Sequence, residues 1–383
     1  MLARSRVLAS ALALALAATP VARADEPPAD APSPAGEAAE VVPEPPPNWA
    51  FKDTSRPVKV VVLAGSIGAW PRDPYAERLA ELCRNVEVKN LSKTGYGALQ
   101  LKQRFRQQVL ENRRLPLGAR GDTSEYWLVF QGGLNSVGMP ESTNHHMREL
   151  YVTAHGRGFK VVGFTLTPWG DESDRRRWAG VEGLRYLRFT RTIVDYVLGT
   201  LSPREALGDY AAKRAGGADA PWQPAELPDV AIDLYRAPWL RDAEAPLRAE
   251  APLRRALERD PSWKKAHAGL DEAARAAALD ADVAEAAAIP QWFLRAELRS
   301  FDHIHPNAEG HRRIAEYACP HLPASWGCEC PPLPPGAEPA APPAVAEPPA
   351  GAVDQVLLPF YPPWVRRLLR MLRGEPESAA VPP

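Results

Sequence analysis

The sequence predicts an α/β fold, a three-layer α/β/α domain with a five-stranded parallel sheet and an additional Ala-rich helical insertion. Two observations predict it. Five short runs are rich in β-branched and aromatic residues, and longer helix-like segments lie between most of them. Strands that alternate with helices are typical of a parallel sheet whose two faces are both covered by helices.

The expected elements follow from residue type and apolar spacing. The strands are expected at 58–64, 86–90, 126–131, 160–167 and 229–234. The helices are expected at 74–85, 98–114, 144–158 and 183–201, the last with apolar residues on one helical face.

The first 24 residues have the pattern of an export signal. Arg4 and Arg6 precede an apolar Ala/Leu stretch, and Ala22-Arg23-Ala24 forms a small-x-small cleavage pattern. The apolar run is interrupted and shorter than the roughly 20 residues of a membrane-spanning helix, so an uncleaved anchor is the less favoured alternative. We therefore expect a secreted protein, periplasmic or extracellular.

Composition divides the rest of the chain. The 42 prolines lie heavily toward the two ends, and the Pro-rich stretches 25–56 and 331–350 are expected to be disordered linkers. One domain is then expected at 57–330. Within it, the stretch at about 241–290 is rich in Ala, Arg and Glu and is interrupted by prolines, which indicates a helical insertion or lid. A single helical repeat is the alternative, although one repeat cannot bury its own apolar face.

The tail at 351–383 contains "PPWVRRLLRMLRG", a stretch that would form an amphipathic basic helix. Such helices bind membrane interfaces, so a peripheral contact with a membrane or the cell envelope is expected. Docking on its own domain or fraying is the alternative. The formal net charge of −1 gives no indication of a nucleic-acid partner.

Four cysteines, Cys83, Cys319, Cys328 and Cys330, are present in a chain expected to reach an oxidising compartment. Disulfides are therefore expected, and the sequence leaves all three possible pairings open. A zinc site is the rival interpretation, but the "CEC" spacing lacks a well-placed fourth ligand.

Small and polar residues follow the expected strands. In an open parallel sheet, ligands bind beyond the carboxyl ends of the strands. The first strand ends at Gly65-Ser66, the second runs into a loop with Gly95, and the third leads to Asn135. Ser66 is a candidate nucleophile in this position, and close packing or helix capping is the alternative. Asp233 in the fifth strand is expected to be structural.

Asp302 and His305 form a second candidate pair, within "SFDHIHPNAEGHRRIAEYA". Pro306 suits the first turn of a helix, so His305 is expected at or beside its N-cap. Asp302 then lies three residues earlier, where its carboxylate reaches one imidazole nitrogen and leaves the other facing outward. A capping carboxylate alone is the alternative. The remaining histidines show no convergent pattern and are expected at the surface or in packing: His145, His146, His155, His267, His311 and His321.

Together these residues resemble the SGNH (GDSL-type) hydrolase family, over about residues 59–318. The resemblance is carried by "GGLN", "DHIHPNAEGHRRIAEY" and the spacing in "NLSKTG". The serine block departs from the family's Gly-Asp-Ser, because this chain has Ala64-Gly65-Ser66, and Ser136 stands where Asp is usual. The resemblance implies a flavodoxin-like three-layer fold.

The resemblance also implies a mechanism. Ser66 would be the nucleophile, His305 its general base and Asp302 the group that orients His305. The oxyanion would be held by the backbone N–H groups of Ser66 and Gly95 and by the side-chain amide of Asn135, with Gly97 as an alternative donor. This chemistry requires no cofactor and no metal.

The expected reaction is hydrolysis of a carboxylic ester through an acyl-enzyme. Trp70 and Trp169 follow the first and fourth strands. Ordinary packing is the slightly favoured interpretation for them, and a substrate-binding role, in which they stack on sugar rings at the mouth of the site, is the alternative. A carbohydrate O-acetyl esterase is the favoured interpretation and an esterase of acyl lipids the runner-up. The third alternative is a catalytically degenerate hydrolase-fold protein that acts as a binding module or scaffold.

Overall fold

The structure is a computed structural model and describes residues 47–333. The expected signal segment, most of both expected linkers and the C-terminal tail lie outside these described residues. Within the described range, no helix combines the length and the apolar character needed to cross a membrane.

A single sheet of five parallel strands forms the centre of the domain, in the order β2-β1-β3-β4-β5. The strands are β1 (Val58–Ala64), β2 (Val86–Asn90), β3 (Glu125–Gln131), β4 (Phe159–Phe164) and β5 (Val230–Ile232). Every pairing is parallel, which confirms the predicted fold class. Ala64 pairs with Gln131, so β1 and β3 end level with one another, and the residues that follow them emerge side by side.

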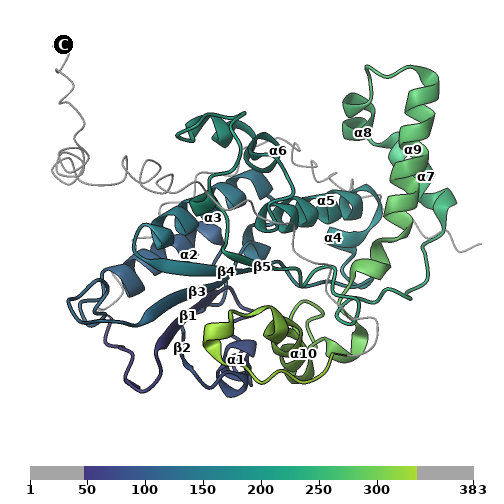
Figure 1. Ribbon diagram of the computed structural model, residues 1–383. Coiled ribbons are helices and arrows are strands. Elements are labelled where there is room, and N and C mark those ends of the chain that lie inside the picture. The colour runs from purple at the N-terminus through teal and green to yellow at the C-terminus, as the bar shows by residue number, and fades with distance from the viewer. Residues whose placement is uncertain (1–46, 334–383) are drawn as a thin grey trace, which may run out of the picture. The chain divides into compact units, whose positions relative to one another are not determined.

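Helices cover both faces of the sheet (Figure 1). One face carries α1 (Tyr75–Leu82) and α10 (Ala308–Ala318), which pack against each other. The other carries α2 (Ala98–Arg104), α3 (Pro140–His155) and α5 (Gly180–Val197), with the short α4 (Arg175–Trp178) and α6 (Pro203–Leu207) beside α5.

The side chains of β1 show why the sheet needs both layers. Val58, Val60 and Val62 belong to one hydrophobic cluster and Val61 and Leu63 to the other, and all five are almost completely buried. Successive side chains of a strand point to opposite faces, so a strand with apolar residues on both faces requires cover on both sides. The apolar Val/Leu composition of β1 therefore requires helices on both faces of the sheet, which is the three-layer arrangement.

One expected helix changes character partway along. The stretch expected to be helical at 98–114 forms α2 and continues as a π-helical segment, Phe105–Leu110. Phe105 and Val109 are buried in this segment, so the apolar contacts continue although the hydrogen-bond pattern widens.

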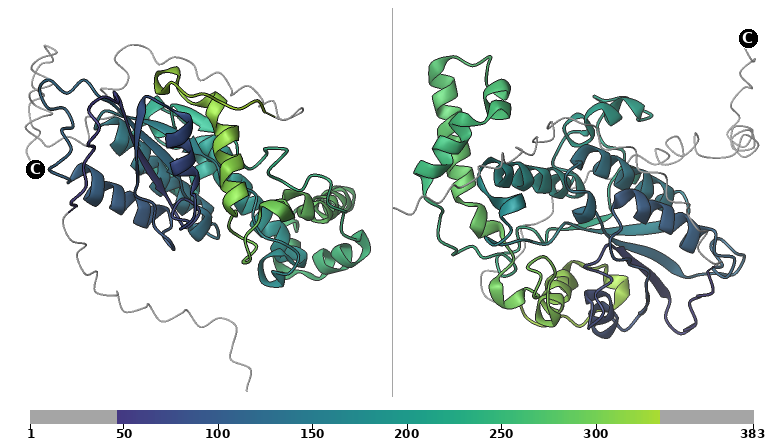
Figure 2. Two further views of the ribbon diagram at one scale, coloured as in Figure 1. Left: turned by 90° about the horizontal axis from the view of Figure 1, so that it is seen from below. Right: turned by 180° about the vertical axis from the view of Figure 1, so that it is seen from behind.

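The insertion consists of α7 (Glu250–Arg259), α8 (Pro261–Ala266) and α9 (Glu272–Ala287), with α7 and α9 side by side (Figure 1, Figure 2). Leu253 and Leu257 of α7 bury their side chains in the domain core. Arg188 of α5 pairs with both Asp282 and Glu285 of α9. The insertion is therefore packed onto α5 by apolar contacts and a small ion-pair network.

The folded unit begins earlier than the expected boundary at residue 57. Trp49 and Phe51 pack against the domain core, with their ring centroids 5.5 Å apart. The Trp49 carbonyl accepts a hydrogen bond of 2.9 Å from the Asn112 side chain, and Glu87 accepts bonds from the backbone of Lys52 and Asp53. Because this stretch is Pro-rich, its composition predicts a linker, although Trp49 and Phe51 in it pack against the core.

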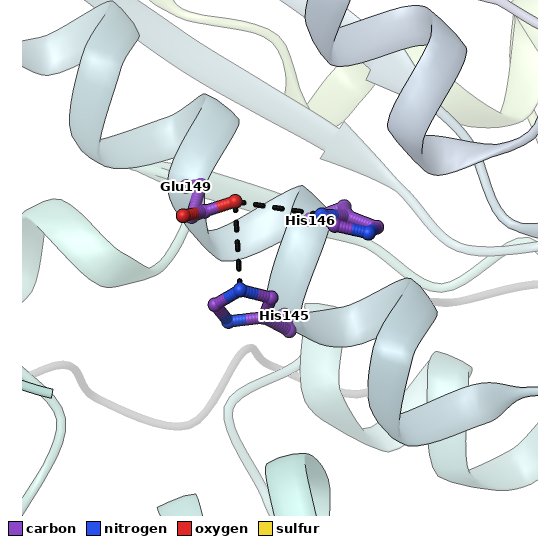
Figure 3. Close-up of side chains that lie close together, drawn as sticks. All are labelled: His145, His146 and Glu149. Atoms are coloured by element: carbon purple, nitrogen blue, oxygen red, sulfur yellow. Dashed lines mark hydrogen bonds and ion pairs between the residues drawn. The ribbon is translucent and has the colours of Figure 1, made fainter. Parts of the chain in front are cut away.

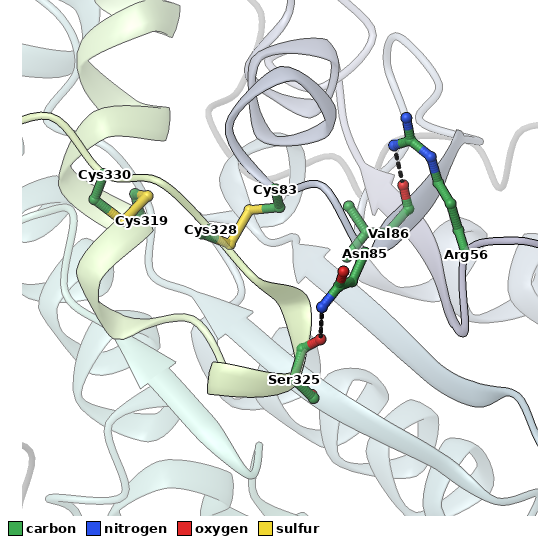
Figure 4. Close-up of a disulfide and its surroundings, with 8 residues drawn as sticks. All are labelled: Arg56, Cys83, Asn85, Val86, Cys319, Ser325, Cys328 and Cys330. Carbon is green, nitrogen blue, oxygen red and sulfur yellow. Dashed lines mark hydrogen bonds between the residues drawn. A yellow bond between two sulfur atoms is a disulfide. The ribbon is translucent and has the colours of Figure 1, made fainter.

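Two disulfides join the cysteines as Cys83–Cys328 and Cys319–Cys330 (Figure 4). Around the first of them, the Asn85 side chain donates to the Ser325 carbonyl at 3.0 Å. The C-terminal part of the described chain is therefore attached to the segment between α1 and β2. The structure selects one of the three open pairings and leaves no cysteine of the described residues for a zinc ion.

Removal of the long-range disulfide should cost more stability than removal of the local one. The Cys83–Cys328 bridge spans 245 residues and Cys319–Cys330 spans 11, and closing a longer loop removes more chain entropy from the unfolded state. We expect Cys83→Ala/Cys328→Ala to lower the free energy of unfolding by about 5 kcal/mol and Cys319→Ala/Cys330→Ala by about 3 kcal/mol. Urea denaturation of the two double variants beside the parent measures this order, and the reverse order would contradict it.

Candidate active site

Ser66 lies in the tight turn directly after β1, and its residue surface is only 8% exposed. Its Oγ is 2.6 Å from Nε2 of His305, a hydrogen-bond distance between a hydroxyl and an imidazole. The residue before it has to be small, since a Cβ at Gly65 would lie 3.0 Å from the Asn135 amide nitrogen and 3.3 Å from the Tyr96 carbonyl oxygen. The strand end therefore brings Ser66 and Asn135 close together.

His305 is held from its other side by Asp302. The His305 Nδ1 is 2.5 Å from Asp302 Oδ2, so the two ring nitrogens face the carboxylate and the serine respectively. The second oxygen, Oδ1, accepts bonds from the backbone N–H groups of Ile304 at 3.1 Å and His305 at 3.0 Å. His303 between them has a left-handed backbone, with φ of 60°, which turns the chain back toward Asp302.

These contacts keep Asp302 ionised. Burial by itself would raise the pKa of Asp302, but the backbone and ring donors of His305 and the backbone N–H of Ile304 outweigh it, and the pKa is below its ordinary value. A carboxylate in this state fixes the orientation of the imidazole and stabilises a positive charge on it.

The start of α10 differs from its expected position. The N-cap is Asn307, whose Oδ1 accepts from the Gly310 N–H at 2.9 Å, so His305 lies two residues before the cap. The Asn307 side-chain amide also donates to the carbonyls of Glu297 and Arg299 at 2.8 and 3.1 Å. Asn307 thus fixes the start of the helix and the base of the catalytic loop, defined here as residues 299–305. Its preference for the N-cap was the signal that could have located it.

The loop after β4 is joined to the catalytic loop by hydrogen bonds and an ion pair. Asp171 Oδ2 is 2.7 Å from His303 Nδ1, and the Gly170 N–H donates to the His303 carbonyl at 3.1 Å. Arg299 donates in turn to the Gly170 carbonyl at 3.2 Å. Sequence reasoning missed these residues, because nothing in their spacing indicates contact with a segment so distant in the chain.

A small cavity adjoins Ser66 between the loops after β1 and β3. Its walls include Ser66, Tyr96, Gly132, Gly133 and Asn135, and its volume is about 10 Å³. We call it the acyl cavity. Among the described residues, the backbone N–H groups of Ser66 and Gly95 have no hydrogen-bond partner, whereas the N–H of Gly97 is bonded to Gln100 at 3.2 Å.

The free donors favour Gly95 over Gly97 as an oxyanion donor. Gly95 has a φ of 80°, which only glycine adopts readily, and Tyr96, the next residue, forms part of the cavity wall. The Asn135 amide donates one N–H to the Tyr96 carbonyl at 3.1 Å. An amide carries two N–H donors, so its second one is available to a ligand.

Trp70 lies directly against the candidate general base. Its ring stacks on His305 with centroids 5.0 Å apart and 21° between the planes, and the same tryptophan stacks on His311 at 6.4 Å. Tyr75 continues this column at 6.2 Å from His311. Trp70 therefore orients the His305 ring. The sequence left packing and sugar stacking open for Trp70 and did not indicate His305 as its partner.

His311 is fully buried within the aromatic column, and neither of its ring nitrogens has a partner among the described residues. Burial lowers the pKa of His311 to about 4, and the neighbouring His305 adds to the effect. The ring is therefore neutral at physiological pH.

The structure decides between the two interpretations of Trp169 in favour of packing and against the substrate-binding role. Trp169 is only 2% exposed, packs edge-on against Trp178 with centroids 4.6 Å apart, and donates to the Thr190 hydroxyl at 3.2 Å. A buried indole presents no face to a sugar, so Trp169 is a core residue. Its position after β4 was compatible with both roles, and only burial distinguishes them.

One cluster away from Ser66 has the donor set of a metal site. His145, His146 and Glu149 of α3 place three potential ligand atoms within 4.8 Å of one another (Figure 3). The ammonium of Lys102, however, lies 2.5 Å from Glu149 Oε2 and 3.4 Å from His146 Nδ1. The chain's own cation thus already neutralises the carboxylate of this cluster.

Comparison with known proteins finds no matching family model and no matching curated protein. Solved structures do resemble the chain. A GDSL-like lipase from Bacteroides thetaiotaomicron is 14% identical with a TM-score of 0.38, over 70% of this chain and 88% of its own. A putative SGNH hydrolase from Slackia heliotrinireducens is 14% identical with a TM-score of 0.34, over 67% and 95%. An acetylxylan esterase from Geobacillus stearothermophilus is 12% identical with a TM-score of 0.33, over 71% and 94%.

His311 should make the protein less stable in acid. In the unfolded chain its imidazole takes up a proton near pH 6.5, but the folded ring resists protonation down to about pH 4. The unfolded state therefore binds more protons in this interval, and stability falls as the pH falls from about 6.5 to about 4. We expect His311 to account for about 3 kcal/mol of this loss, and urea denaturation of His311→Leu across the interval should show a correspondingly flatter pH dependence. An unchanged slope would contradict the assignment.

Trp70 should act through His305. Without the indole the imidazole is free to tilt away from Ser66, and misplacement of a reacting group by about 1 Å can cost about 100-fold in rate. We expect Trp70→Ala to lower kcat on p-nitrophenyl acetate by about 10- to 100-fold, and Trp70→Phe, which retains a stacking ring, to restore most of it. A loss that appears only in KM, or one that Phe does not rescue, would argue against this positioning role.

Proposed function

We propose that this chain is an SGNH-type serine hydrolase that cleaves carboxylic esters through an acyl-enzyme. The observation that carries the proposal is the continuous chain of hydrogen bonds from Ser66 Oγ through His305 to Asp302, with distances of 2.6 and 2.5 Å. A serine hydroxyl is a weak nucleophile at neutral pH and needs such an adjacent, oriented base.

In the acylation step, Ser66 Oγ attacks the ester carbonyl carbon and its proton passes to His305 Nε2. The resulting imidazolium is stabilised by the ionised Asp302 on the opposite side of the ring. Collapse of the tetrahedral intermediate breaks the bond to the alcohol oxygen, which takes the proton from His305. In the second step, a water oxygen attacks the acyl carbonyl carbon while His305 Nε2 takes its proton. Collapse of this second tetrahedral intermediate breaks the bond between the acyl carbon and Ser66 Oγ, Oγ takes the proton back from His305, and the acyl group leaves as a carboxylic acid.

The negative charge of the tetrahedral intermediate needs donors already in place. The N–H groups of Ser66 and Gly95 and the second N–H of the Asn135 amide are available to supply them. Loss of one such donor typically reduces kcat by about 100- to 1,000-fold. In this mechanism Asn135 therefore contributes nearly as much as the base.

The size of the acyl cavity supports a small acyl group. About 10 Å³ holds roughly one water-sized group, and apolar Ile67 and Leu166 form part of the wall. An acetyl methyl group suits this space, whereas a long chain would have to leave by another route. This favours an acetyl esterase, and a carbohydrate O-acetyl group is the substrate that we propose.

A lipid ester is the second candidate, and exposed apolar side chains near the site favour it. Phe301, beside Asp302, is 87% exposed, and Met139, shortly after Asn135, is 64% exposed. Surface apolar groups of this size around a reactive serine suit contact with an acyl chain or a lipid interface.

The cellular address is also a proposal. Two disulfides are compatible with an oxidising compartment, in line with the export signal that the sequence predicts. We place the protein in the periplasm or outside the cell. The proposed membrane or envelope contact of residues 351–383 is testable by co-sedimentation of the full chain with anionic liposomes.

Hydrolysis of p-nitrophenyl acetate, butyrate and octanoate by the mature protein tests the function. We expect kcat/KM to be highest for the acetate, because only the acetyl group fits the acyl cavity, and Ser66→Ala to reduce every rate to background. Asn135→Ala should retain the chain-length order at a rate about 100-fold or more below the parent.

A fluorophosphonate probe is the control for a mismatched substrate. Labelling of Ser66 without hydrolysis of any of the three esters would show an active site offered the wrong ester. Absence of both labelling and hydrolysis would refute the hydrolase and support the binding or scaffold alternative. A preference for the octanoate would favour the lipid esterase.

A further inference from the structure

Three side chains of α3 converge away from Ser66: His145, His146 and Glu149 (Figure 3). We call them the α3 cluster. Residues three and four positions apart share one face of a helix, so both histidines reach the carboxylate that follows them. Their potential ligand atoms are two imidazole nitrogens and one carboxylate oxygen, which all lie within 4.8 Å of one another. The proposed hydrolase chemistry does not use this set of donors.

The spacing of the donor atoms fits a zinc ion. Zn²⁺ binds imidazole nitrogen and carboxylate oxygen at about 2.0–2.2 Å, so neighbouring ligand atoms around a tetrahedral ion lie about 3.3 Å apart. Glu149 Oε2 is 3.4 Å from His146 Nδ1 and 3.6 Å from His145 Nε2. Small side-chain rotations therefore suffice to place all three atoms on one ion.

The surroundings of His145 point independently to a ligand. Its side chain is only 12% exposed, and its Nδ1 is buried with no hydrogen-bond partner within residues 47–333. Its Nε2 faces Glu149, and the 3.6 Å between Nε2 and Oε2 is too long for a hydrogen bond. Buried polar atoms usually have partners, and an exception calls for an explanation such as a bound ion. An ion between Nε2 and Oε2 would bond to both.

The α3 cluster combines one fixed ligand with two accessible ones. Tyr210 stacks on the His145 ring with centroids 4.5 Å apart and 18° between the planes, which fixes the orientation of the imidazole. His146 and Glu149 are only partly buried, so an ion can reach them from solvent. Oriented ligands and an entry path are both required of a metal site.

Lys102 of α2 competes for the same place. Its ammonium lies 2.5 Å from Glu149 Oε2 and 3.4 Å from His146 Nδ1, so the fold already holds a positive charge beside two of the three donors. A lysine ammonium is carried on a flexible four-carbon chain, and partly exposed ion pairs of this kind contribute little stability. A divalent ion can therefore displace Lys102, whose side chain turns toward solvent.

The donor set selects the class of ion. Two imidazoles and one carboxylate suit Zn²⁺ and related transition-metal ions, whereas Ca²⁺ and Mg²⁺ prefer ligand sets made of oxygen atoms. The cysteines of the described residues are all joined in disulfides, so none of them offers a competing thiolate. We propose that the α3 cluster binds a divalent transition-metal ion, best matched by Zn²⁺, in exchange for Lys102. This site is separate from Ser66 and does not depend on the esterase function.

Calorimetric titration of Zn²⁺ into the mature chain and three variants tests the site. We expect Glu149→Gln and His146→Gln to raise the Kd of the ion by about tenfold or more, because each removes a ligand. We expect Lys102→Met to lower Kd by about tenfold, because the competing cation is gone. The gain in affinity distinguishes this site from adventitious binding to surface histidines. Ca²⁺ and Mg²⁺ should show no binding at the cluster.

The matched control is His267→Gln, a histidine at the end of α8 that lies outside the α3 cluster, and it should leave Kd unchanged. Thermal unfolding supplies a second readout, since an ion that binds only the folded state stabilises it. Zn²⁺ at about 100 times Kd should raise Tm by about 5 °C in the parent and not in Glu149→Gln.

Three results would overturn the site. They are absence of zinc binding in the parent, a Kd that Glu149→Gln leaves unchanged, and a Kd that Lys102→Met fails to lower. Binding seen only in Lys102→Met counts with the first, because the lysine would then be the permanent cation of the cluster. None of these measurements involves an ester, so their outcome is independent of whether Ser66 is catalytic.

Discussion

The hydrogen bond between Ser66 Oγ and His305 Nε2 joins residues 239 positions apart, and much of the structure can be understood as holding its two ends. Ser66 is fixed by the level ends of β1 and β3 in the sheet. His305 is fixed by Asp302 in the same turn, by the Trp70 ring on one face and by the Asn307 cap that starts α10. Since a catalytic base acts only within hydrogen-bond reach, each of these contacts bears directly on reactivity.

Beside the proposed catalytic residues lies a buried histidine, His311, whose burial without hydrogen-bond partners within residues 47–333 costs folding free energy. His311 is enclosed, and among the described residues both of its ring nitrogens are unpartnered, although buried polar atoms usually find a partner. In the aromatic column its ring stacks on Trp70 and on Tyr75. A neutral imidazole fills that space without placing a second positive charge behind His305, where it would oppose formation of the imidazolium.

In the proposed function, the cavity beside Ser66 limits the size of the acyl group. This acyl cavity is small and is made by loops of the α/β domain. A short acyl group fits this space, which is why we propose an acetyl ester as the substrate. The exposed Phe301 is the observation that the glycan interpretation leaves without a role.

The sequence by itself determined the sheet and the candidate catalytic residues, because buried parallel strands are largely apolar runs and their following residues face one edge. Strand ends singled out Ser66 and Asn135, local spacing singled out Asp302 and His305, and the resemblance to the SGNH hydrolases implied their roles. The sequence did not determine whether Trp169 is buried, how the cysteines pair or that Trp70 contacts His305. Each of these depends on which distant segments of the chain meet.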